Sequence, residues 1–143
     1  MLRSLDEQIE AILGPDLDAW IVSQLPPGVN MQERGFGDFI SATASEVHAF
    51  AQRHGVPLGY FWMQGHAPAY KNDRVVVEPE GAGWKSYYTE RGEISDLRQF
   101  ATFEEALMAG VQQLMHDLWI RLNHRQWSAQ GMQPPFPPLP EAR

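Results

Sequence analysis

The sequence contains no cysteine, and this absence excludes several classes of protein at once. Without Cys among its 143 residues, the chain has no disulfide framework and no thiolate for a zinc site, an iron–sulfur cluster or nucleophilic catalysis. Long apolar runs are also missing, since none approaches the roughly 18–20 residues of a membrane span. The residues from Met1 to Glu7 become acidic too early to form the apolar core of a signal peptide. We therefore expect a cytoplasmic protein that does not contact membranes.

Basic residues are also scarce. The chain has 11 Lys and Arg residues against 18 Asp and Glu residues, which gives a formal net charge of −7. General binding to nucleic acid needs cations opposite the phosphates, so we expect no nucleic-acid partner. A basic protein suits this chain better as a partner, because opposite net charges speed encounter. Residues 1–58 carry eight acids against three arginines, so most of the excess negative charge lies in the N-terminal part.

Helix signals are strongest toward the two ends of the chain. Capping boxes, in which a Ser or Thr precedes a Glu by three residues, mark helix starts at Ser4, Thr43 and Thr102. Small residues at 106 and 110 predict that the last helix lies close against a sheet. The apolar stripe of that helix consists of Phe103, Leu107, Val111, Leu114 and Leu118. The predicted helices cover residues 5–13, 16–21, 43–54 and 103 to about 124, and residues 28–42 are predicted as a loop.

The middle of the chain changes to aromatic and β-branched sequence that is typical of strands. The predicted strands cover residues 58–63, 74–78, 84–91 and 94–100. Their close spacing favours an antiparallel meander of three to four strands, because parallel strands need a longer crossover. The sequence therefore predicts an α+β fold with N-terminal helices, a small antiparallel sheet and a long C-terminal helix packed on it. We expect one globular domain over 1–131 and an extended Pro-rich tail over 132–143.

Signals for catalysis and cofactor binding are few. The five histidines match no zinc-binding spacing, so we expect no metal site, and we expect no cofactor. The segment Gln32 to Gly37 resembles the glycine loop with which GNAT-type acetyltransferases bind acetyl-CoA. Glycines in such a loop let backbone N–H groups reach phosphate, although here helical sequence precedes the loop where a strand is needed. A small acyl-CoA-dependent transferase therefore stays open as an alternative.

Acids and aromatic residues are the side chains that we expect to bind a partner. Tyr and Trp are enriched at the centres of protein interfaces, and acids complement a basic partner. The alternatives are that the aromatics form the core and that the acids keep strand edges and turns soluble. The predicted partner-binding residues are Asp16, Asp18, Asp38, Glu78, Glu80, Trp84, Tyr88, Glu90 and Glu93.

The stretch from Tyr87 to Glu93, followed by Phe100 to Leu107, resembles a known pattern. It is similar to the C-terminal half of some small immunity proteins of bacterial polymorphic-toxin and contact-dependent systems, over about residues 70–120. The resemblance implies a cytoplasmic, non-enzymatic protein that binds and neutralises one cognate toxin. The leading hypothesis is therefore an immunity-type inhibitor. Besides the transferase, an oligomeric adaptor or structural protein, with its aromatic face buried in a homodimer, is the other alternative.

Overall fold

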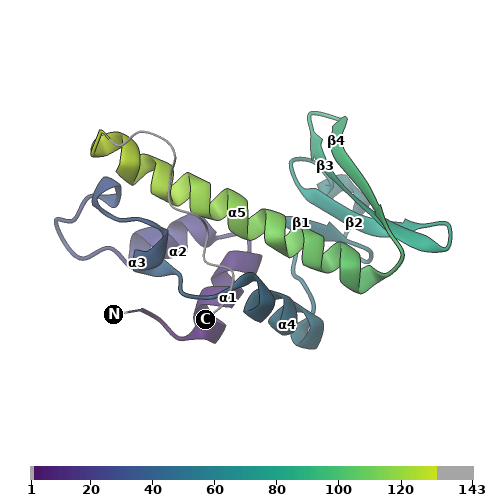
Figure 1. Ribbon diagram of the computed structural model, residues 1–143, viewed down its shortest axis with the longest axis horizontal. Helices are drawn as coiled ribbons and strands as arrows, with labels where there is room; N and C mark the ends of the chain where they lie inside the picture. The colour runs from purple at the N-terminus through teal and green to yellow at the C-terminus, as the bar shows by residue number, and fades with distance from the viewer. Residues whose placement is uncertain (1, 132–143) are drawn as a thin grey trace.

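A long C-terminal helix, α5 (Phe103–Ala129), runs through the molecule and connects its two parts. The computed structural model describes residues 2–131, and the predicted Pro-rich tail over 132–143 lies outside the described residues. Short helices from the first part of the chain lie along α5, and a four-stranded sheet packs at its N-terminal half (Figure 1). The predicted α+β architecture is confirmed.

The three helices that the sequence predicts before residue 58 are present and begin where their capping residues indicate. They are α1 (Leu5–Leu13), α2 (Leu17–Ser23) and α4 (Ala44–His54). The Ser4 hydroxyl accepts a hydrogen bond from the backbone N–H of Glu7 at 3.2 Å. At α4 the capping box is complete, because the Glu46 carboxylate also accepts from the backbone N–H of Thr43. These contacts satisfy N–H groups that a helix start otherwise leaves without partners.

Gln8 joins α1 to the segment that precedes α4. Its amide is buried, and its Oε1 accepts hydrogen bonds from the backbone N–H groups of Ser41 (2.8 Å) and Ala42 (3.2 Å). Its Nε2 donates to the carbonyl of Arg3 at 2.7 Å. A buried amide is tolerated only when such bonds are made, so Gln8 fixes the relative position of these two segments.

The prediction of a plain loop over 28–42 is wrong in part. This segment contains a 3₁₀ turn, η1 (Met31–Glu33), and a short helix, α3 (Phe36–Phe39). The N–H of Phe36 donates to Oδ1 of Asn123 on α5 at 2.8 Å. Phe36 and Phe39 are buried in the main core. A side chain distant in sequence therefore fixes α3, which explains why local sequence signals do not predict it.

Helix α5 carries the apolar stripe that the sequence predicts. Leu107, Val111, Leu114 and Leu118 are buried in the main core. Gly110 faces the ring of Phe61, and a Cβ at this glycine would lie 2.7 Å from Cε1 of that ring. The helix continues past the predicted end near residue 124, because Trp127 is also buried and its ring lies 5.4 Å from that of Trp119.

The sheet contains β1 (Phe61–Met63), β2 (Val75–Glu80), β3 (Gly83–Glu90) and β4 (Glu93–Phe100), in that order. Strands β2, β3 and β4 form the predicted antiparallel meander. The prediction that all neighbours are antiparallel is wrong for β1, which pairs with β2 in parallel. The connection from 64 to 74, which contains the 3₁₀ turn η2 (Pro68–Tyr70), is long enough for the crossover that a parallel pair needs.

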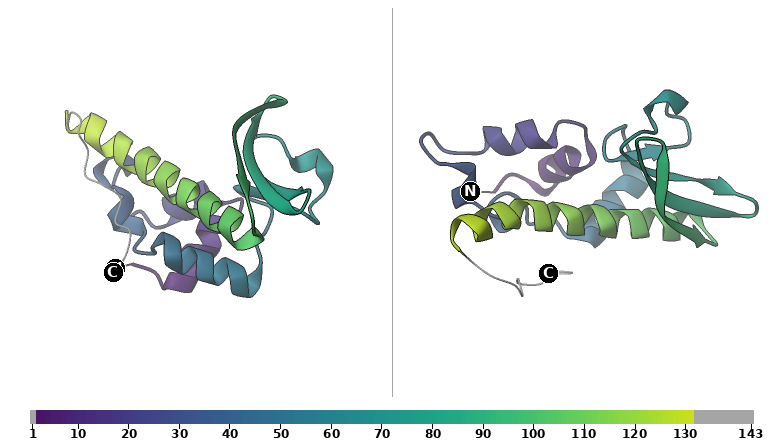
Figure 2. Two further views of the ribbon diagram at one scale, coloured as in Figure 1. Left: turned by 45° about the vertical axis from the view of Figure 1, so that its right-hand side comes forward. Right: turned by 90° about the horizontal axis from the view of Figure 1, so that it is seen from above.

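Helix α5 covers one face of the sheet, and β3 and β4 curve away from it (Figure 2). The buried valines Val75 and Val77 of β2 face the main core, while Val76 joins a smaller cluster with Trp62 and Tyr87 on the opposite face. This alternation confirms that some of the strand aromatics lie away from the helix. None of the helices within residues 2–131 combines the length and the apolar composition that crossing a membrane requires.

Candidate functional site

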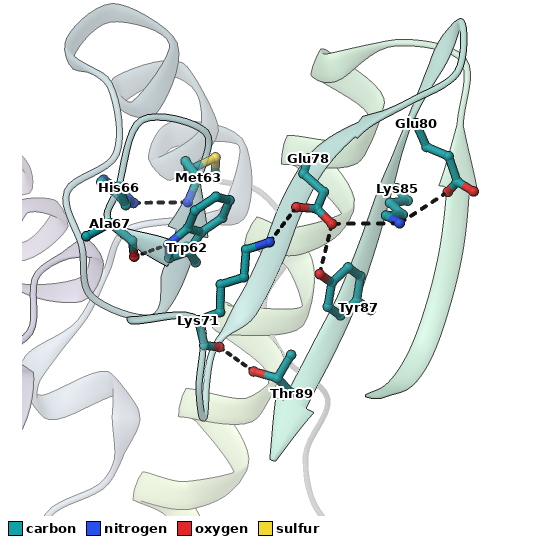
Figure 3. A network of polar contacts seen from close by, with 10 residues as sticks. All are labelled: Trp62, Met63, His66, Ala67, Lys71, Glu78, Glu80, Lys85, Tyr87 and Thr89. Atoms are coloured by element: carbon teal, nitrogen blue, oxygen red, sulfur yellow. Dashed lines mark hydrogen bonds and ion pairs between the residues drawn. The ribbon is translucent and has the colours of Figure 1, made fainter. Parts of the chain in front are cut away.

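The face of the sheet away from α5 carries a network of charged residues (Figure 3). At its centre, the Glu78 carboxylate lies 3.0 Å from Nζ of Lys71 and accepts a hydrogen bond from the Tyr87 hydroxyl at 2.9 Å. Nζ of Lys85 lies 3.7 Å from Glu78 and 3.9 Å from Glu80. Two of the predicted partner-binding acids, Glu78 and Glu80, are therefore already neutralised by lysines of this chain.

The titration of this network follows from its contacts. Burial of Glu78 opposes its ionisation, but the hydrogen bonds from Lys71 and Tyr87 and the lysine charges outweigh it, so the pKa of Glu78 is lowered. Burial, together with the Glu78 carboxylate, raises the pKa of Tyr87 to about 12. The ammonium of Lys71 also lies 4.5 Å from the centre of the Trp62 ring, so cation–π attraction adds to the network. These closely paired groups stabilise the sheet.

The hairpin of β3 and β4 projects from the molecule. Its two-residue turn, Arg91 and Gly92, has positive φ at both positions, as tight hairpins prefer. The predicted residues Glu90 and Glu93 flank this turn and are exposed. The predicted aromatics Trp84 and Tyr88 instead pack against the main core on the α5 side, half-buried. The structure therefore places the acids of the hairpin at its tip and its two predicted aromatics near the helix.

Strand β4 is exposed along almost its whole length. It is the last strand in the sheet, so one of its edges has no neighbouring strand within residues 2–131. Ile94 is 60% exposed and Leu97 is 56% exposed. The pairing with β3 is irregular between Ser86 and Tyr88, opposite Asp96, whose φ is +55°. Such a bulge interrupts part of the edge, and the remaining N–H and C=O groups are available for pairing. Sequence analysis did not select Ile94 or Leu97, because an alternating strand gives no sign of which edge stays open.

A groove of about 670 Å³ follows β4 on the side of α5. Asp96, Leu97 and Arg98 form one wall, and Gln113, His116 and Asp117 belong to the other. The Arg98 guanidinium donates to the side chain of Gln113 at 3.3 Å. The groove therefore combines apolar and polar side chains next to an unpaired strand edge, which is an arrangement suited to an extended chain.

A second hollow, of about 290 Å³, shares Asp117 with this groove. It lies where the turn between α1 and α2, the residues before β1, and α5 meet. The Tyr60 hydroxyl donates to Oδ2 of Asp117 at 2.7 Å. Burial and this acid raise the pKa of Tyr60. The Arg74 side chain is fixed in the wall by the carbonyls of Gly59, Tyr70 and Asn72, at 2.9, 2.7 and 3.2 Å.

The predicted acids of the N-terminal part are separated rather than gathered. Asp18 lines the second hollow and pairs with Arg121 at 3.2 Å. Asp38 caps α3 through a 2.7 Å hydrogen bond from the N–H of Gly35. Asp16 precedes α2 without a side-chain capping bond and is exposed. Of these three acids, Asp18 and Asp38 each line a concave surface, in two separate hollows.

The glycine loop at 32–37 has little of the geometry that an acyl-CoA site needs. The N–H of Gly35 donates to Asp38, and the N–H of Phe36 donates to Asn123. A Cβ at Gly35 would lie 2.7 Å from Oδ1 of Asn123, so the absence of a side chain at this position lets the loop lie close against α5. Two of the amides that would bind a pyrophosphate therefore already have partners within the chain.

The described residues include no group of three or more His, Asp or Glu residues that could hold a metal ion. Two of the histidines make polar contacts: Nε2 of His48 lies 3.3 Å from Glu104, and Nδ1 of His66 accepts from the N–H of Met63. Comparison with family models, with curated proteins and with solved structures returned no match.

Proposed function

We propose that the protein binds a basic toxin enzyme and neutralises it without catalysis, as immunity proteins do. The observation that carries this proposal is the exposed edge strand β4, with Ile94 and Leu97 open to solvent. The stretch that resembles immunity proteins, about residues 70–120, includes β2, β3, β4 and the first half of α5. The resemblance and the exposed edge therefore concern the same part of the molecule.

An open strand edge favours pairing with another chain. Its free N–H and C=O groups give hydrogen bonds in register, and its alternate side chains give specificity. Proteins usually protect such edges with short strands, charges, bulges or a covering loop. Here the bulge at Asp96 protects only part of an eight-residue strand. An edge that retains two large exposed apolar side chains is consistent with a binding role.

The net charge supports a basic partner. The acids of residues 1–58 give this part of the chain most of the charge of −7. Many enzymes that act on nucleic acids or nucleotides carry basic active-site clefts, and an acidic inhibitor approaches such a cleft faster than a neutral one. The long-range field then steers the encounter, while β4 and its groove supply the close contacts.

Co-expression with the product of the adjacent gene, which we expect to be the cognate toxin, tests the proposal. We expect a complex on size exclusion and restored growth of cells that express the toxin. The double variant Ile94→Asp/Leu97→Asp should lose both, because it places charge on the edge. Val22→Asp is the matched control, since Val22 is 56% exposed on α2. If the unaltered chain neither forms a complex nor restores growth, the proposal that the protein is an inhibitor is wrong. If the double variant still forms the complex, the proposal that β4 binds the toxin is wrong.

The same edge suits a second copy of the chain, which gives a homodimer other than the one with a buried aromatic face that the sequence suggests. Light scattering on the purified protein separates the two cases. A monomer that becomes a one-to-one complex with the toxin supports the inhibitor, whereas a dimer that Ile94→Asp dissociates supports the adaptor.

A further inference from the structure

The hollow beside Asp117 has the size and lining of a receptor for one side chain. Its volume of about 290 Å³ lies at the lower end of small ligand sites. The buried side chains of Ile12, Leu114 and Leu118 form part of its lining. Leu114, Asp117, Leu118 and Arg121 follow helical spacing, so apolar and charged groups alternate along one face of α5. Such a lining suits a long side chain with an apolar stem and a polar head.

The two arginines that line the hollow neutralise its two acids only in part. Oδ2 of Asp117 accepts from Tyr60, and among the described side chains Oδ1 of Asp117 has no hydrogen-bond partner. The Arg74 guanidinium donates to three backbone carbonyls, which turn it toward the wall. Arg121 and Asp18 are 47% and 70% exposed, and ion pairs that are this exposed are weak and exchange readily.

Two tyrosines near Asp117 respond to its charge. Besides burial, Asp117 raises the pKa of Tyr60. Burial and the charges of Glu90, Asp73 and Asp117 raise the pKa of Tyr88. The hollow itself holds two acids, Asp18 and Asp117, and two arginines, Arg74 and Arg121. Because Arg74 is bonded to backbone carbonyls and Arg121 pairs with Asp18, the Asp117 carboxylate is the charged group that a cationic guest can contact.

We propose that this hollow receives one Arg or Lys side chain of the basic partner, with its cationic head on Asp117 and its stem against the leucines of α5. The inference rests on the proposed function, because it names the chemistry by which the partner is recognised. Since Asp117 also lines the groove beside β4, one partner segment can pair with the strand edge and insert this side chain. Arginine is among the residues that most often dominate the energy of an interface.

A probe that needs no toxin tests the site itself. We expect N-acetyl-arginine amide, added to the ¹⁵N-labelled full chain, to shift the amide resonances of Leu17, Gly59, Tyr60 and Asp117 in a saturable way. N-acetyl-citrulline amide has nearly the same shape without the charge and should cause no such shifts. Equal responses to the two compounds, or shifts confined to other residues, would overturn the inference, as would no response to the arginine compound in the millimolar range.

Variants test the site within the complex. Asp117→Asn keeps an oxygen for Tyr60 but removes the charge, and we expect it to weaken binding of the toxin by at least about thirtyfold. Asp18→Asn changes an exposed residue, so it should have little effect on folding, and we expect it to weaken binding of the toxin as well. Asp6→Asn, the control with the same change of charge on α1, should change the affinity less than about fivefold.

The two proposals fail in different ways. If the affinity for the toxin does not change in Asp117→Asn and Asp18→Asn, the hollow does not receive a cationic side chain, and the proposed inhibitor function is unaffected. A specific response to N-acetyl-arginine amide without any complex would overturn the inhibitor function and leave a cation site. Thermal unfolding of each variant near that of the unaltered chain shows that a loss of binding is not a loss of fold.

Discussion

The helical part of the molecule and its β3–β4 hairpin use the same residue types in opposite ways. Ile12 in α1 is 1% exposed and belongs to the main core, whereas Ile94 in β4 is among the most exposed large apolar residues of the described chain. In the helical part, most large apolar side chains are buried in the main core, although Val22 is exposed, and the buried amide of Gln8 has hydrogen-bond partners. In the hairpin, the aromatic residues of β3 pack against the core clusters, whereas Ile94 and Leu97 of β4 stay exposed. The comparison therefore distinguishes apolar residues that stabilise the fold from the exposed apolar residues of one edge strand.

The sharpest test of this difference is the same truncation in both places. Ile12→Ala should lower the free energy of unfolding by about 2–5 kcal/mol, because it leaves a cavity in the core. Ile94→Ala should change it by no more than about 0.5 kcal/mol, because the side chain is solvated in the folded state. Urea unfolding followed by circular dichroism measures both. Similar losses for the two variants would show that the hairpin is part of the stabilising core.

The contact between α5 and strand β1 of the sheet is tested at Gly110. Gly110→Ala puts a methyl group against the fully buried ring of Phe61, and we expect a net loss of about 1–3 kcal/mol of unfolding free energy from overpacking. The better helix propensity of Ala offsets part of this cost. In a Phe61→Leu background the clash should be relieved, so Gly110→Ala should become neutral or stabilising there. Equal effects in both backgrounds would mean that the ring does not set the distance between α5 and β1.

The contribution of Tyr87, on the outer face of the sheet, to stability is tested by raising the pH. Tyr87 has a pKa of about 12 in the fold against an ordinary value of 10.0, so its contribution is complete below pH 10 and is lost as the pH rises to 12. The unfolding free energy should therefore fall over this range, and more steeply in the unaltered chain than in Tyr87→Phe. Urea titrations at pH 9, 10, 11 and 12 give the two slopes at about one-unit spacing. Parallel profiles would show that Tyr87 keeps its ordinary environment.

Acid gives the smallest expected effect, on the same network. The pKa of Glu78 is lowered from 4.5, so its carboxylate contributes stability above pH 4.5 that is lost as the pH falls through its pKa in the fold. Glu78→Gln should thus be less stable than the unaltered chain at neutral pH, and the gap should narrow below pH 4.5. A gap that is constant with pH would assign the loss to packing rather than charge.

Much of the fold follows from local signals in the sequence. Ser4, Thr43 and Thr102 mark helix starts that the structure confirms, and the apolar stripe of α5 faces the core as its spacing predicts. The parallel pairing of β1 and the helix α3 were not predictable in this way. The first depends on the path of the segment from 64 to 74, and the second on a hydrogen bond from Asn123. Both are tertiary contacts that leave no periodic trace.

The candidate site was predictable only in part. Glu90, Glu93 and Asp18 are accessible, as a partner-binding role needs, whereas Trp84 and Tyr88 pack toward the core. Ile94 and Leu97 look like ordinary strand residues until the strand order shows that β4 lies at an edge. Asp117 gave no signal, because its role depends on the meeting of α5 with Tyr60. The partner itself remains a prediction.

The position of α5 after both the short helices and the sheet has a consequence for the order in which these elements are completed. The short helices and the sheet bury apolar side chains against this helix, yet it is synthesised after all of them. Until residues 103–129 have been added, Phe61 and the core side chains of α3 and α4 lack the covering that α5 provides, so the nascent chain exposes apolar surface. Neither part can complete its core before α5 is present, and truncation within α5 should leave neither part folded alone.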